Sequence, residues 1–193
     1  MRILRGGLSS LALIVPVAAL AMSVVERDFA ELVALAEQVV VGRVVDIRPG
    51  TDDRGGPLTL VSFADLTVLK GEVGRELTLE FTGGKAADGK TVAIADMPRF
   101  TLGERAVLFV RGNGRDICPL VGVWQGRFRV VYDPQLKSDV VERHDGLRLS
   151  GLDGAQLRSA PRGSTQPALS LSDFESLVRE ELAHPSSPAG GQR

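Results

Sequence analysis

Residues that build metal sites and disulfides are scarce in this chain of 193 residues, which has one cysteine and two histidines. Cys118 has no partner for an internal disulfide, so packing must stabilise the fold. Residues 116–120 have the pattern of a strand edge or turn with a half-buried thiol, and a reactive thiol would need a neighbouring base. The dense alternation of acidic ligands that defines a calcium loop is also absent. We therefore predict neither a metal site nor a cofactor.

An excess of one sign of charge is also missing. The chain has 23 Lys and Arg against 24 Asp and Glu, a formal net charge of −1. The two signs are interspersed along the sequence. Binding to nucleic acid or to an anionic membrane depends on positive charge, so both are excluded as a main role.

Long hydrophobic runs are absent apart from residues 8–21. Arg2 and Arg5 precede this run, and Ala-Leu-Ala at 19–21 ends it, which is typical of a secretory signal peptide. We predict cleavage near Met22 and a periplasmic or secreted protein. The run is shorter than the roughly 20 unbroken apolar residues that span a bilayer. The alternative is an uncleaved anchor, and only then would the protein contact the membrane.

The remaining chain has the pattern of a β-rich domain. Apolar spacing predicts a short amphipathic helix over residues 28–38, with Asp28 as its N-cap. From there to Tyr132, apolar and polar residues alternate in short segments that glycine and proline turns separate. Gly112-Asn113-Gly114 is typical of a hairpin turn with positive φ. Five or more strands without intervening helices indicate a small antiparallel barrel or sandwich.

The pattern weakens after residue 133 and recovers near the C-terminus. Short strands are predicted near Val140 and Leu149. A second amphipathic helix opens at Leu171, where Ser172 and Glu175 fit a capping box. Residues 184–193 are predicted to be a disordered tail.

Four segments carry a resemblance to a known group. These are the sequence AEQVVVGR at 36–43, VLKG at 68–71, FTLGER at 100–105 and VLF at 107–109. In this order they resemble the netrin-like and tissue-inhibitor-of-metalloproteinase group, and most closely its exported bacterial members. The resemblance covers roughly residues 30–132. It implies a mainly β, OB-like antiparallel barrel over residues 22–183, with an N-terminal and a C-terminal amphipathic helix.

The inhibitory residues of that group have no counterpart here. Inhibition by those proteins depends on an amino-terminal cysteine that chelates the protease zinc, whereas the predicted mature chain begins at Met22-Ser23. Their disulfides are missing as well, because Cys118 stands alone. The resemblance therefore implies a fold and an extracytoplasmic setting, without inhibitory residues.

The aromatic and basic cluster of Trp124, Arg127, Arg129 and Tyr132 is the most site-like feature. On an OB-like barrel such residues can stack on a ligand, and Trp and Arg are enriched at interaction hot spots. The structural alternative places Trp124 in the core beside Phe128 and leaves the two arginines facing water.

We interpret the protein as a non-enzymatic exported binding module. Its expected partner is another extracytoplasmic protein, with a secreted protease as one candidate. Two alternatives remain open. One is an accessory structural protein of the envelope, and the other is a small hydrolase that uses His144, with Asp139 as a supporting carboxylate.

Overall fold

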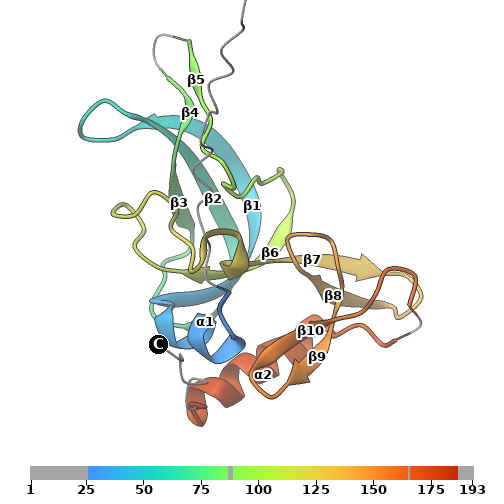
Figure 1. Cartoon of the computed structure of the whole chain (residues 1–193). Coiled ribbons are helices and arrows are strands. Elements are labelled where there is room, and N and C mark those ends of the chain that lie inside the picture. The colour runs from blue at the N-terminus through green and yellow to red at the C-terminus, as the bar shows by residue number, and fades with distance from the viewer. Residues whose placement is uncertain (1–25, 87–88, 165, 187–193) are drawn as a thin grey trace, which may run out of the picture.

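The computed structural model describes residues 26–86, 89–164 and 166–186 (Figure 1). The predicted signal peptide and residues 187–193 of the predicted tail lie outside these residues. The fold is mainly β, with 43% strand and 15% helix. In chain order the elements are α1 (Phe29–Leu35), β1 (Gln38–Thr51), β2 (Pro57–Lys70), β3 (Leu77–Thr82), β4 (Gly84–Lys85), β5 (Thr91–Val92), β6 (Arg105–Val110), the 3-10 helix η1 (Val123–Gly126), β7 (Arg127–Asp133), β8 (Ser138–Glu142), β9 (Leu149–Asp153), β10 (Gln156–Ser159) and α2 (Leu171–Ala183).

Six of the strands form one antiparallel sheet in the order β3-β2-β1-β6-β7-β8. Two small hairpins, β4–β5 and β9–β10, stand apart from it (Figure 1). Among the described residues, no ladder joins β3 to β7 or β8. The closed barrel expected from the sequence is therefore not formed by strand pairing.

The loop after β6 covers the edge of β3 instead. The side chain of Asn113 accepts a hydrogen bond from Glu80 N at 3.0 Å and donates one to Thr78 O at 2.8 Å. Thr82 N donates to Ile117 O at 3.0 Å. These contacts satisfy backbone groups that a closing strand would otherwise pair.

Strand β6 and residues 39–42 of β1 are buried on both faces of the sheet. Val39 and Val41 of β1 belong to the core on the helix side, whereas Val40 belongs to the core on the opposite side. In β6, Phe109 faces the helices and Leu108 faces the other core. Burial on both faces explains why Val39–Val41 and residues 106–110 are continuous apolar runs rather than alternating sequences.

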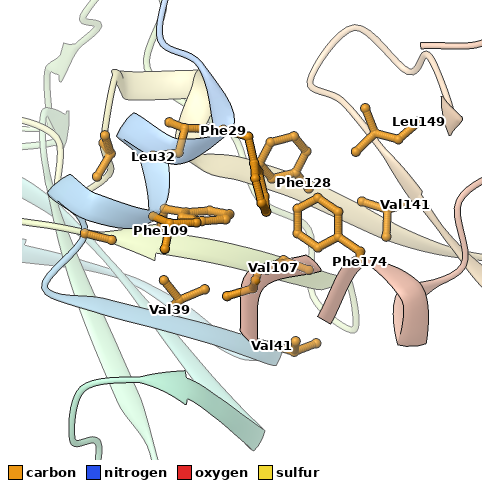
Figure 2. Packing of buried hydrophobic residues seen from close by; sticks show 14 of the residues in the cluster. Phe29, Leu32, Val39, Val41, Val107, Phe109, Phe128, Val141, Leu149 and Phe174 are labelled. Atoms are coloured by element: carbon orange, nitrogen blue, oxygen red, sulfur yellow. The ribbon is translucent and has the colours of Figure 1, made fainter. Parts of the chain in front are cut away.

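A cluster of four phenylalanines joins the helices to the sheet. Figure 2 shows the side chains of Phe29 from α1, Phe109 from β6, Phe128 from β7 and Phe174 from α2 gathered together. Their contacting rings have centroids 5.2 to 6.4 Å apart, most of them edge to face. This is the favoured geometry for aromatic pairs, and it fixes α1 and α2 over one face of β6 and β7.

Side-chain caps set the starts of both helices. Asp28 caps α1, as predicted. In α2 the cap is Ser170, whose hydroxyl accepts a hydrogen bond from Asp173 N at 3.1 Å. The predicted capping box of Ser172 and Glu175 is therefore wrong, because Ser172 already lies within the first turn. None of the helices in the described part of the chain has the length and apolar character needed to cross a membrane.

Candidate functional site

A narrow cleft of about 40 Å³ opens beside the phenylalanine cluster. Five segments line it: residues 26–32 at the start of α1, the 3-10 helix η1, the beginning of β7, the loop after β8, and β10. Three of its lining residues are arginines, and one is the single tryptophan of the chain. The cleft thus brings together segments that are far apart in the sequence.

One wall of the cleft is a stacked pair of rings. Trp124 of η1 and His144 of the β8–β9 loop have ring centroids 3.8 Å apart, with their planes tilted by 37°. Burial lowers the pKa of His144, and the positive charges of Arg143 and Arg127 act in the same direction against the opposing influence of Asp145. The neutral imidazole is therefore the favoured form at neutral pH.

Arg127 contributes a buried cation at the base of the site. The residue is only 8% exposed, and its guanidinium pairs with Glu104 and lies 4.7 Å from the centroid of the Phe100 ring. Its Nε is buried and finds no acceptor among the described residues. A buried donor without an acceptor costs about 1–3 kcal/mol.

Two further arginines stand at the rim. Arg143 approaches Asp145 through Nε at 3.7 Å, and Arg27 approaches Glu31 through Nη1 at 3.5 Å. Both distances exceed a normal charge-assisted hydrogen bond. The backbone N of Arg27 donates to Gln125 Oε1 at 2.8 Å, which ties the start of α1 to η1.

The structure divides the four predicted binding residues between two places. Trp124 and Arg127 line the cleft. Arg129 and Tyr132 line a separate hollow of about 560 Å³, together with residues 101–105 and Asp139. Arg129 lies 3.9 Å from Glu142, and Tyr132 is 59% exposed. The suggestion that Arg127 would face water is wrong, because Glu104 and Phe100 bury it.

His144 lies in the cleft, but not in the setting the hydrolase alternative required. Asp139, its expected carboxylate partner, accepts a hydrogen bond from Arg105 Nη1 at 2.7 Å instead. The described lining of the cleft includes no serine, threonine or cysteine. The ring that His144 contacts is Trp124.

Cys118 lies away from the cleft, in the core enclosed by β1, β2, β3 and β6. It is buried rather than half-buried, and burial raises the pKa of its thiol to about 11. The thiol is therefore protonated at neutral pH and a poor nucleophile. Over the described ranges, no group of three or more metal-ligating side chains comes together.

Sequence reasoning missed the residues that complete the cleft. Arg27, Gln125, Arg143 and Gln156 reach it from four different segments, and none belongs to a local motif. Only the tertiary fold brings these positions together. Comparison of the chain with protein-family models, curated proteins and solved structures found no match.

Proposed function

We propose that the protein is a non-enzymatic binding module that works outside the cytoplasm and holds its partner at the Trp124–His144 cleft. The observation that carries the proposal is the cleft itself, which brings the single tryptophan, stacked on His144, together with arginines from three separate segments. Trp and Arg are also the residues most enriched where binding energy concentrates.

The arrangement of the sheet supports an OB-like barrel in a partly open form. Strands β1, β2 and β3 form a meander. Strand β1 also pairs with β6, and β6 pairs with β7. The loop that carries Asn113 takes the place of the closing ladder along β3. Barrels of this kind bind ligands through exposed faces and loops, and the cleft lies where the loop after β8 meets η1.

The partner we propose is another extracytoplasmic protein, with a secreted protease as one candidate. The signal-peptide pattern of residues 1–21 and the netrin-like resemblance support this setting. An aromatic and basic cleft suits a protein surface, because hot spots pair an aromatic anchor with a desolvated charge.

A site-specific crosslinking experiment tests the proposal. A photoreactive amino acid replaces Gln156, an exposed residue that lines the cleft, or Gln135, another exposed glutamine, in the β7–β8 turn. In the source cells we expect one exported protein to be crosslinked at position 156 and none at 135. The crosslink should disappear in the Trp124→Ala variant. Equal adducts at both positions, or none at position 156, would refute the proposed site.

A further inference from the structure

We propose that the protein has a second binding site, a hollow that takes an uncharged, apolar small molecule. The hollow lies between the sheet and residues 93–100, which we call the covering segment. It shares no lining residue with the Trp124–His144 cleft. This inference therefore goes beyond the proposed function and does not depend on it.

The covering segment lies against the sheet without pairing with it. It follows β5 and leads into the loop before β6 (Figure 1). Within the described ranges, no backbone hydrogen bond joins it to β1, β2 or β3. Its contacts are made by side chains instead. Met97 and Phe100 pack on the core of that side, and the ring of Phe100 lies 5.4 Å from that of Phe63 and 5.3 Å from that of Phe81, centroid to centroid.

The space left between the covering segment and the strands has the size of a small-molecule site. Its volume is about 910 Å³, within the range of roughly 300–1,000 Å³ that is typical of ligand pockets. Residues of β1, β2 and β3 line one side, and the covering segment lines the other. Val61 and Phe81 of the lining are at most 2% exposed, whereas Val92 is 44% exposed. The hollow thus reaches from the surface to the core, and a molecule within it would be covered from two sides.

The chemistry of the lining favours an apolar, uncharged occupant. Ten of the 17 lining residues have apolar side chains, so apolar contact dominates the surface that a ligand would meet. Water beside such a surface is displaced favourably by an apolar molecule. Asp96 and Arg99 are the charged residues of the described lining; they are opposite in sign, and both are exposed. The lining therefore gives neither an anion nor a cation an advantage.

The uncharged dye N-phenyl-1-naphthylamine tests the site, because its emission rises when it leaves water for apolar surroundings. The purified protein is titrated with the dye, and the bound dye is then displaced by 1-decanol or by decanoate. These two competitors have the same chain length and differ in charge. We expect saturable binding of the dye. Decanol should displace it at a lower concentration than decanoate, because burial of an unpaired charge is costly.

Matched variants locate the dye. Ile94→Asp places a charge in the half-buried part of the lining, and we expect it to weaken dye binding about tenfold. Ile117→Asp makes the same change at an isoleucine that is 53% exposed and lies outside the lining, so it should bind like the parent. Far-UV circular dichroism checks that the sheet is intact. If Ile94→Asp alters the spectrum, Val92→Asp replaces it, because Val92 lines the hollow near the surface.

Three results would overturn the proposal: no saturable binding of the dye, unchanged binding in the variants of the lining, or displacement by decanoate at the same or a lower concentration than by decanol. Arg99→Gln should leave dye and decanol binding unchanged, because an uncharged ligand makes no ion pair with this residue. Tight decanoate binding that this variant abolishes would show that the ligand is an amphipathic anion instead.

Trp124→Ala separates this site from the cleft. Trp124 does not line the hollow, so the variant that should abolish the crosslink at position 156 should still bind the dye. Failure of the dye to bind would leave the proposed function standing, and failure of the crosslink would leave the hollow standing. Loss of dye binding in Trp124→Ala would refute the assignment of the dye to the hollow.

Discussion

At the scale of single residues, His144 is held where its protonated form is disfavoured. Burial lowers its pKa below the ordinary value of about 6.5, with Arg143 and Arg127 adding to the effect. We expect the imidazole of His144 to titrate below pH 6.5 in a proton NMR experiment. The His184→Gln variant leaves a single imidazole signal to follow, since the chain has two histidines. A pKa at or above 6.5 would contradict the packing against Trp124.

The same shift has a consequence for stability. The unfolded chain would bind a proton at His144 more readily than the folded one, because the folded-state pKa is the lower of the two. The free energy of unfolding should therefore fall as the pH drops from about 6.5 to the folded-state pKa, and this contribution should then level off. The His144→Gln variant should lack this part of the pH dependence.

Sequence could identify some of these residues but not their surroundings. Trp124 and Arg127 stand out by residue type and spacing, and both do line the cleft. The burial of Arg127 was not predictable, because the residues that cover it, Glu104 and Phe100, lie more than 20 positions earlier in a loop. Alternation in a strand indicates which face a side chain takes, but not which loop folds over that face.

At the scale of elements, the β7–β8 turn depends on one buried carboxylate. Asp133 accepts hydrogen bonds from Leu136 N at 3.0 Å and Gln135 N at 2.7 Å, and it pairs with Arg148. The bond from Leu136 is the main reason that the pKa of Asp133 is lowered, with Gln135 and Arg148 assisting against burial. The stabilisation should be complete above the unfolded-state pKa of about 3.9 and be lost as the pH falls through the lower folded-state pKa.

The Asp133→Asn variant tests this assignment by thermal unfolding across a pH series. Its melting temperature should lie below that of the parent at neutral pH, and the gap should close in acid. Asp153→Asn is the matched control, because Asp153 pairs with Arg158 in the open and both side chains are at least 60% exposed. Exposed pairs contribute about 0–1 kcal/mol. A gap that persists at acid pH would refute the role of the carboxylate.

Elements with a strong periodic pattern were predictable, and those that depend on distant contacts were not. The apolar run of β6 predicted a central strand, and burial on both faces confirms it. Asn113 was recognised as part of a turn with positive φ, which Gly112 and Gly114 do adopt. Its contact with the edge of β3 could not be foreseen, because Thr78 and Glu80 lie more than 30 residues away.

At the scale of the whole molecule, two cores share the same pair of strands. The core on the helix side contains the phenylalanine cluster, and the core on the other side contains Phe63, Leu79 and Phe81. Both include side chains of β1 and β6. Neither core can lose its packing without exposing these two strands, so we expect the described domain to unfold as one cooperative unit.

Phe174→Ala tests this coupling from the far end of the chain. The side chain is fully buried in the helix-side core, and its removal should cost about 3–5 kcal/mol. Leu177→Ala on the same helix is the control, with a smaller cost because Leu177 is only partly buried.

Urea unfolding is followed by Trp124 emission, which reports on the helix side, and by far-UV circular dichroism, which reports mainly on the sheet. The two curves should coincide in the variant as in the parent. When one core loses its packing, β1 and β6 become exposed, and the other core needs the same two strands. An early change in emission with the sheet still intact would show that the helix-side core unfolds by itself, and the shared strands would then not couple the two.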